Sequence, residues 1–428
     1  MRKRLEAQGG SAADWHRLGE LLLVEHRFEA ALDAMGKAVD LAPGNTRFVS
    51  GLALALSWNR RYEDAIRTRQ SLQHLGGRDI AAQADDLKYA HDFAGAIALV
   101  DAAEAAGRAD AAAKVIRGIA RLYLGDHRAG FADMENRFDA GLTKLPDTLP
   151  RTRWDGTPAP GLRLLVCPDQ GLGDDIMMIR FLPALADAGV AATFLARAPL
   201  EALLRASPLG AAVQSRVSDL SAFDAWCPVG SLPHLLGCDP APPPPTPLSV
   251  PDTSMRFGQA TTAPYADAFR IGVCWTGNPQ YPRNAMRSAT PRLFEPLARR
   301  DGVALFSLCF GDDVAALAET GMDGAIVDAC ATADFADTAG VIAHMDLVIT
   351  TDTALAHLAA SLGAPTWNLL PTEGFWQYGA TGEATPWYPS MRLFRQPRRG
   401  DWDGVMARVG EALTERLQAR SGTTNRSS

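Results

Sequence analysis

Long apolar runs, paired cysteines and an excess of basic residues are all missing from this sequence. No stretch approaches the roughly 20 apolar residues of a membrane-spanning helix. No apolar segment follows the basic start MRKRLEAQGG either, so we expect neither a membrane span nor a signal peptide. The six cysteines are scattered without a C-x-x-C pair, which disfavours a structural zinc site and a disulfide framework. The net charge of −7 argues against general binding to nucleic acid or anionic membranes, and we expect a cytoplasmic protein.

The composition that remains is that of a globular protein, 47% hydrophobic and 21% charged over 428 residues. This length exceeds one ordinary core and predicts several domains. We expect helical repeats over 1–143, a linker over 144–161, an α/β lobe over 162–238, a proline-rich connector over 239–264, a second α/β lobe over 265–418 and a disordered tail over 419–428.

The first segment shows the spacing of a helical repeat. Over residues 11–45, large and small apolar residues recur on two successive helices, and Pro43 ends the unit; they are Trp15, Leu18, Gly19, Leu22, Ala31, Met35 and Ala38. The spacing matches the tetratricopeptide (TPR) pattern of about 34 residues, and three looser units follow, ending at Phe138. A generic helical bundle is the alternative. Stacked helix pairs form a concave surface that holds a peptide or protein, so we predict a protein partner.

The glycine-rich turn after the apolar strand 163–167 is the first candidate site. Gly171 and Gly173 permit a close backbone approach to a ligand, and Asp174 and Asp175 fall at the start of the next helix. Helix capping is the alternative role for one of these acids. The turn is neither G-x-G-x-x-G nor the phosphate loop G-x-x-x-x-G-K-[ST], so a dinucleotide or triphosphate-hydrolase function is weakly indicated.

Two more polar turns follow strands in the second lobe. The strand 270–275 leads into Thr276-Gly277-Asn278-Pro279 and then Arg287-Ser288, and the run 347–349 leads into Thr350-Thr351-Asp352-Thr353. A helix with His357 one turn in follows the last of these. Alternating strands and helices in two halves predict two doubly wound lobes whose strand ends share a cleft.

The residue types in these turns complement one another chemically, as hydrogen-bond donors, an acceptor and a candidate base. Arg287, three threonines (Thr276, Thr351 and Thr353) and the free amides of the last helix are donors for a diphosphate. Asp352 could accept from a ribose or sugar hydroxyl, and Asp174 could act as a general base on an acceptor hydroxyl. His357 can point into the cleft, and a core histidine bonded to a carbonyl is its alternative.

From about residue 154 to 418 the chain resembles a GT-B glycosyltransferase of the heptosyltransferase-like branch, family 9. The resemblance is carried by QGLGD (170–174), IGVCWTGNP (271–279) with RS (287–288), and DLVITTDTALAHLAASLGAPTW (346–367). PWYPSMRLF (386–394) resembles a tail of the bacterial subgroup that has N-terminal TPR repeats. The expected fold is therefore α plus α/β, with TPR helical repeats followed by two Rossmann-like lobes.

The resemblance implies inverting, metal-independent glycosyl transfer from a nucleotide sugar, which is a substrate and not a cofactor. It implies that Asp174 is the catalytic base and that the remaining residues bind the donor: Gly171, Gly173, Thr276, Gly277, Asn278, Arg287, Thr351, Asp352, Thr353 and His357. Arg287 stands where lipopolysaccharide heptosyltransferases have a lysine, which keeps the charge and changes the geometry.

The combination of repeats and GT-B lobes is similar to O-GlcNAc transferases and bacterial flagellin glycosyltransferases. It implies transfer to a protein Ser or Thr recruited by the repeats, with flagellin as a candidate acceptor and a nonulosonic acid or hexosamine as the sugar. Two alternatives stay open: a glycosyltransferase acting on lipopolysaccharide or surface polysaccharide, and a non-catalytic TPR adaptor.

Overall fold

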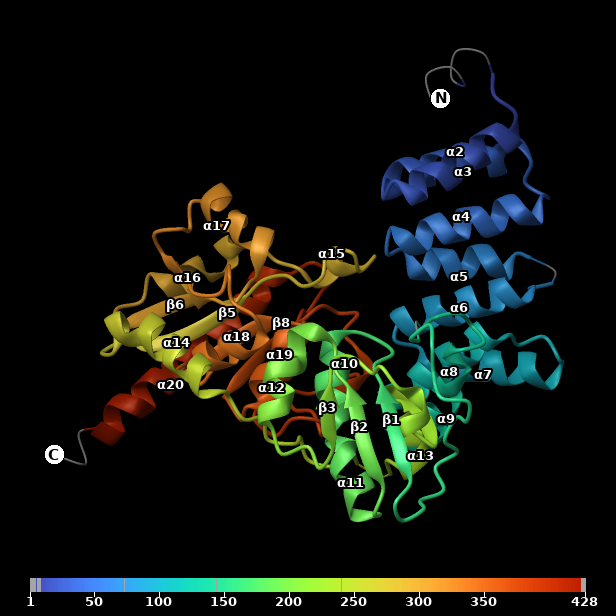
Figure 1. The fold of residues 1–428 in the computed structure, drawn as a ribbon. Helices are drawn as coiled ribbons and strands as arrows, with labels where there is room; N and C mark the ends of the chain where they lie inside the picture. The colour runs from blue at the N-terminus through green and yellow to red at the C-terminus, as the bar shows by residue number, and fades with distance from the viewer. Residues whose placement is uncertain (1–4, 6–8, 73, 144, 240, 425–428) are drawn as a thin grey trace. The chain divides into compact units, whose positions relative to one another are not determined.

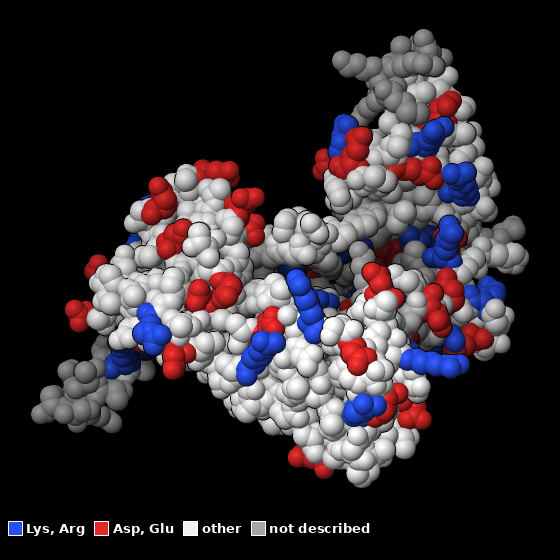
Figure 2. Space-filling model, in the orientation of Figure 1, with Lys and Arg blue, Asp and Glu red and all other residues white. Residues whose placement is uncertain are grey.

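The computed structural model describes residues 5, 9–72, 74–143, 145–239 and 241–424, with side chains as far as residue 420. It divides into two compact units, Met1–Leu142 and Thr143–Ser428. Figure 1 shows that the first unit is built from helices and that the second contains the parallel sheets. Among the described helices none is both long enough and apolar enough to span a bilayer. Acidic and basic side chains are interspersed over the face drawn in Figure 2.

The first unit is an array of helix pairs. Its helices are α2 (Ala12–Val24), α3 (Phe28–Leu41), α4 (Thr46–Trp58), α5 (Tyr62–Gln70), α6 (Gly77–Tyr89), α7 (Phe93–Ala105), α8 (Ala111–Tyr123) and α9 (His127–Met134), followed by a 3₁₀ turn, Glu135–Arg137. The first helices of the pairs begin at residues 12, 46, 77 and 111, which are 34, 31 and 34 residues apart. The prediction of a helical N-terminal region is confirmed.

The same left-handed turn joins the two helices of each pair. It is formed by His26, Arg60, His91 and Gly125, with φ of 56°, 60°, 64° and 83°. These positions are again 34, 31 and 34 residues apart, so the turn follows the period of the helices. Only the last of them is the residue type that adopts this conformation without steric cost.

Packing within the first pair follows from the pattern of large and small residues. Ser11 and Asp14 cap each other at the start of α2, which satisfies amides that the helix cannot pair itself. Trp15 and the leucines of α2 then pack against the alanines of α3. A Cβ on Gly19 would lie 2.4 Å from Met35 Cγ, so the absence of a side chain at Gly19 allows the two helices to approach.

The second unit contains two parallel sheets. In the first sheet the strand order is β3-β2-β1-β4, formed by β1 (Arg163–Cys167), β2 (Ala191–Leu195), β3 (Ala212–Gln214) and β4 (Ala225–Pro228). The helices that accompany it are α10 (Leu172–Met178), α11 (Leu182–Asp187), α12 (Glu201–Ala206) and α13 (Leu232–Leu236). The central strand β1 is buried from its second residue onward, as expected for a strand covered on both faces.

The second sheet has the strand order β10-β9-β8-β5-β6-β7. Its strands are β5 (Phe269–Cys274), β6 (Val303–Ser307), β7 (Ile326–Asp328), β8 (Leu347–Thr351), β9 (Thr366–Leu370) and β10 (Met391–Arg395). The accompanying helices are α14 (Asp252–Thr262), α15 (Asn284–Arg287), α16 (Glu295–Ala298), α17 (Ala315–Thr320), α18 (Phe335–Ile342), α19 (Ala354–Ser361) and α20 (Trp402–Thr424). The mixed α and α/β class predicted from the sequence is confirmed. The strand β3 was not predicted from the sequence.

Two predicted irregular segments are helical instead. Residues 252–262, assigned to the connector, form α14, which packs closely on α18: a Cβ on Gly340 would lie 1.9 Å from the Ser254 carbonyl oxygen. Residues 419–424, assigned to the disordered tail, continue α20. Arg420 stabilises this end through an ion pair with Asp346 at 3.6 Å and by lying over the Phe269 ring. Residues 425–428 of the predicted tail lie outside the described residues.

Candidate active site

The loop between β1 and α10 carries the carboxylate that the sequence singles out. Gly171 is the extended residue before the helix, so Asp174 lies in the first turn of α10, beside the free amides. Its Oδ2 accepts a hydrogen bond of 2.9 Å from the Gly171 N–H. The capping role, raised as an alternative, is therefore filled by Asp174 itself. Burial raises the pKa of the Asp174 carboxyl, against the Gly171 hydrogen bond and the charge of Arg197, which suits a proton acceptor.

The carboxyl group of Asp175 and the guanidinium of Arg197 lie near Asp174. Asp175 is fully buried, and Arg197 Nη1 lies 3.0 Å from its Oδ2. Burial raises the pKa of Asp175 to about 8, although Arg197 opposes the rise. Arg197 also donates to the Gln170 carbonyl oxygen, so one side chain that follows β2 holds the loop that follows β1. Sequence reasoning missed Arg197, because no local pattern marks an arginine that acts on a neighbouring strand.

The loop after β5 is organised by Asn284, another residue that sequence reasoning missed. Its Nδ2 donates to Thr276 Oγ1 at 3.1 Å and to the Gly277 carbonyl oxygen at 3.2 Å, and its Oδ1 accepts from Arg287 Nε at 3.1 Å. A Cβ on Gly277 would lie 3.0 Å from Arg287 Nη2 and 3.1 Å from Thr353 Cγ2. Gly277 therefore makes room for the guanidinium to reach the start of α19.

Two polar atoms of the turn between β8 and α19 have no hydrogen-bond partner among the described residues. They are Thr351 Oγ1 and Asp352 Oδ2, on residues that are 0% and 2% exposed. Thr353 caps α19 by accepting from the Leu355 N–H at 3.2 Å, and Tyr378 donates to Asp352 Oδ1 at 3.0 Å. Buried unpaired polar atoms are costly, so a ligand that supplies partners would be stabilised here.

The turns from the two sheets meet. A Cβ on Gly173 would lie 2.8 Å from His357 Cδ2 and 3.2 Å from Ala354 Cα, so α10 of one sheet packs against α19 of the other. The side-chain position of Gly173 thus faces a helix, and the approach of a ligand to its backbone stays a prediction. Burial raises the pKa of Asp352 to about 6, the charge of Arg287 opposes the rise, and the charge of Asp174 adds to it. Arg287 and Asp174 therefore each lie within electrostatic range of Asp352.

His357 is a buried, neutral residue at this contact. Its Nδ1 lies 3.0 Å from the Tyr388 hydroxyl, and the side chain of Tyr378 stacks on its ring. Burial, together with the charges of Arg180 and Arg287, lowers the pKa of His357 to about 3. The histidine is bonded to a hydroxyl and not to the carbonyl that the sequence alternative named.

Arg180, which follows α10, bonds to the loop that precedes β10. Its Nη1 donates to the Trp387 carbonyl oxygen at 2.8 Å and to the Pro243 carbonyl oxygen at 3.0 Å, and its guanidinium lies 4.8 Å from the Tyr388 ring centroid. The side chain is 3% exposed, and burial lowers its pKa. Arg180 therefore fixes the aromatic loop that orients His357.

The structure thus brings together most of the predicted site residues. Thr276, Gly277, Arg287 and Thr353 share one set of contacts, with Asp352 and His357 in the same half of the site, and Gly173 and Asp174 of α10 lie across from this half. Asn278 is exposed, and its Oδ1 accepts from the Gln280 N–H, away from this set. Among the described residues no group of three His, Cys, Asp or Glu side chains is placed to hold a metal ion.

Part of the second unit matches a known family. Residues 303–372 match glycosyltransferase family 9 (heptosyltransferase), a segment that runs from β6 past β9 and includes the Thr351–Asp352–Thr353 turn and His357. The match confirms the prediction of a glycosyltransferase domain. Over 325 residues the chain is 28% identical to Protein FlbA of Caulobacter vibrioides, covering 69% of this chain and 53% of that protein. The chain therefore spans about half the length of this curated relative.

Solved structures of low sequence identity are also similar. E. coli ADP-heptose LPS heptosyltransferase II is 15% identical, with 60% of this chain and all of that chain covered and a TM-score of 0.43. A Thermobaculum terrenum O-GlcNAc transferase mutant is 13% identical, with 95% and 93% covered and a TM-score of 0.32. YrrB, a TPR protein with an unusual peptide-binding site, is 16% identical, with 32% and 73% covered and a TM-score of 0.27. At these TM-scores no function follows from the likeness.

Proposed function

We propose that this chain is an inverting, metal-independent glycosyltransferase that moves a sugar from a nucleotide sugar to a protein Ser or Thr hydroxyl. The observation that carries the proposal is the meeting of Asp174, on one sheet, with Arg287 and Asp352, on the other. The Asp174 carboxyl, whose pKa is raised, thus lies across the contact between α10 and α19 from the half of the site that contains Arg287. The same half contains the two polar atoms without a hydrogen-bond partner, Thr351 Oγ1 and Asp352 Oδ2. This is the arrangement that a base, a leaving group and a sugar require.

The second sheet would bind the donor. Arg287, the Thr351 hydroxyl and the first amides of α19 are donors for phosphate oxygens, and Asp352 Oδ2 is an acceptor for a sugar or ribose hydroxyl. Thr276, Gly277 and Thr353 shape this half through their contacts with Asn284 and Arg287. The nucleotide sugar is the substrate of this site, which needs no cofactor.

Asp174 would be the catalytic base. Its carboxylate takes the proton of the acceptor hydroxyl while that oxygen bonds to the anomeric carbon, and the bond from that carbon to the phosphate oxygen breaks. The nucleotide leaves with the negative charge, which Arg287 stabilises. A single displacement inverts the anomeric configuration.

The helical unit would recruit the acceptor. Its repeating helix pairs and turns support the TPR interpretation, and stacked pairs of this kind bind peptides and proteins. Flagellin is the candidate acceptor, a nonulosonic acid or hexosamine the candidate sugar, and the cytoplasm the proposed compartment. A CMP-sugar donor has one phosphate, which would reduce the contribution of Arg287.

A mass measurement tests this function. Purified protein and nucleotide sugars are added to an extract from a mutant that lacks the gene, and proteins and glycans are analysed for added sugar. We expect a mass increase on a protein, which Asp174→Asn lowers by about 10²–10⁴-fold. Asp301→Asn, the same change at an exposed position of the same unit, is the matched control. Undiminished transfer by Asp174→Asn would refute the assignment of the base.

The description of the matched family favours one second candidate. Family 9 is described as heptosyltransferase, so transfer to lipopolysaccharide or surface polysaccharide is the alternative activity. Sugar that appears on a glycan and not on a protein would establish that alternative. A wild-type chain that turns over no nucleotide sugar would instead favour the alternative of a non-catalytic TPR adaptor.

A further inference from the structure

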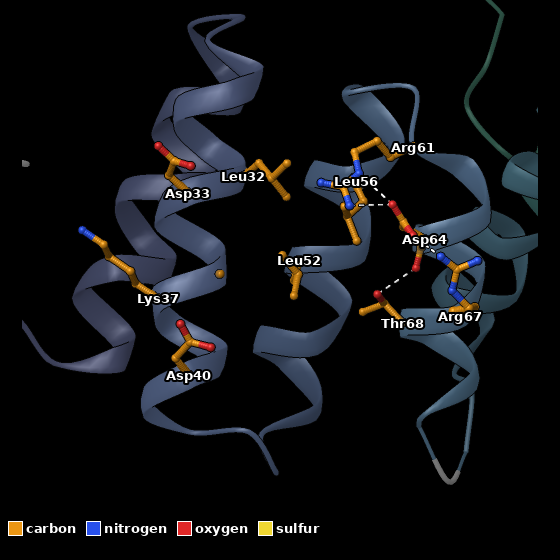
Figure 3. Close-up of a pocket in the computed structure, with 11 residues that line it drawn as sticks. Leu32, Asp33, Lys37, Asp40, Leu52, Leu56, Arg61, Asp64, Arg67 and Thr68 are labelled. Carbon is orange, nitrogen blue, oxygen red and sulfur yellow. Dashed lines mark hydrogen bonds and ion pairs between the residues drawn. The ribbon is translucent and has the colours of Figure 1, made fainter.

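A groove opens on the first unit between α3, α4 and α5 (Figure 3). It has a volume of about 510 Å³, which lies within the size range of ligand-binding pockets. Its floor is formed by Leu32, Leu52 and Leu56, of which the first two are only half-buried. Gly36 lies one turn after Leu32 on α3, and a Cβ there would meet nothing within 4 Å. The groove therefore combines a small leucine patch, which this unit leaves partly uncovered, with charged residues on either side.

The wall formed by α3 is acidic. Asp33, Lys37 and Asp40 are spaced i, i+4 and i+7, so they form one stripe along α3 to the side of the leucines, with a formal charge of −1. The Lys37 ammonium lies 4.3 Å from the Trp15 ring centroid, a cation–π contact with the neighbouring helix α2. Asp33 and Asp40 are exposed, and Asp40 makes no ion pair among the described residues.

The wall formed by α5 is basic. Arg61 and Arg67 share a single carboxylate, Asp64, so the wall carries a formal charge of +1. Their side chains are 55% and 67% exposed, and a guanidinium has five N–H donors, more than one shared carboxylate satisfies. This wall can therefore accept a further carboxylate from a partner.

We propose that this groove binds a short segment of a partner protein in which an apolar side chain lies between a basic and an acidic residue. The apolar side chain covers the leucines, the basic residue faces Asp33 and Asp40, and the acidic residue faces Arg61 and Arg67. Opposite charges on the two walls set the orientation of the segment, and the leucine floor contributes most of the affinity. The segment belongs to the acceptor, so the proposal deepens the proposed function and rests on it for the partner's role.

Peptide selection tests the groove without sugar transfer. A displayed library of random short peptides is selected on the full-length chain, and enriched peptides are measured by fluorescence anisotropy. We expect them to share an aliphatic or aromatic residue flanked by a basic and an acidic one. Gly36→Trp fills the groove and should weaken binding by about tenfold or more. Gly44→Trp, a turn position of the same unit that also has nothing within 4 Å of its Cβ, is the matched control and should bind as the wild type does.

A second variant keeps the test decisive if Gly36→Trp fails to fold. Asp33→Lys with Asp40→Lys reverses the acidic wall at exposed positions and should replace the basic residue of the selected peptides by an acidic one. Equal binding to Gly36→Trp and the wild type, a library without enrichment, or peptides unchanged by the reversal would each overturn the proposal. Because binding is measured without a donor, a chain that binds these peptides but transfers no sugar would refute the proposed function alone.

Discussion

His357 of α19 lies directly against Gly173 of α10, and a methyl group on Gly173 would come within 2.8 Å of the His357 ring. The two helices belong to different sheets, so this contact sets how closely Asp174 approaches the turn that would bind the donor. The ring is held in place because Nδ1 contacts Tyr388, beside which the buried Arg180 lies. The histidine thus acts as a spacer between the two halves of the site.

Gly173→Ala should destabilise the protein and reduce transfer. The added methyl group overpacks the contact between α10 and α19, which typically costs about 1–3 kcal/mol of unfolding free energy. Urea unfolding measures this cost, with Gly324→Ala, where a Cβ has open space, as the comparison. In a His357→Ala background the cost should fall, because the ring that clashes is gone. An equal cost in both backgrounds would show that the methyl group does not act through His357.

Asp352→Asn should stabilise the unliganded protein near neutral pH and abolish donor binding. The folded-state pKa of Asp352 is raised to about 6 from an ordinary value of 3.8, so ionisation of this carboxyl lowers folding stability as pH rises. The advantage of the Asn variant should be absent below about pH 4, grow between about pH 4 and 6, and reach about 1–3 kcal/mol above that. The Asn side chain keeps an acceptor for Tyr378. Urea unfolding across this range checks the sign; an Asn variant that is less stable at pH 8 contradicts it.

Arg197→Met should move the acidic limb of the pH–rate profile to higher pH. The charge of Arg197 lowers the pKa of both Asp174 and Asp175, so its removal raises the pH at which the base loses its proton. Arg205→Met removes an exposed arginine that pairs with Glu201 and should leave the profile unchanged. The measurement is kcat/KM against pH. A uniform loss of rate with an unshifted limb would mean that Arg197 only holds the loop through Gln170.

The positions of the three turns that follow β1, β5 and β8 could be predicted from the sequence, whereas most of the contacts between their side chains could not. Apolar strands that are followed by turns rich in glycine or threonine indicate the carboxyl edge of a parallel sheet, and Asp174, Arg287 and Asp352 all lie in segments that follow such strands. Apart from Asn284, which acts within its own loop, the residues that were missed act over long sequence separations. Arg180 bonds to the carbonyl of Trp387 and Tyr378 bonds to Asp352, and neither pair leaves a local pattern. The close contact of Gly173 with α19 was not predicted, because α19 accompanies the other sheet.

Gly125→Ala and Gly36→Ala should change stability in opposite directions. Gly125 forms the left-handed turn between α8 and α9 with φ of 83°, and an alanine there costs about 1–2 kcal/mol. Gly36 lies inside α3 with open space around its Cβ, so alanine lowers the entropy of the unfolded chain and should stabilise by about 0.5–1 kcal/mol. Neither Cβ would meet an atom within 4 Å, so backbone conformation alone separates the two changes. Urea unfolding of the full-length chain measures both, and two changes of the same sign would contradict the assigned turn.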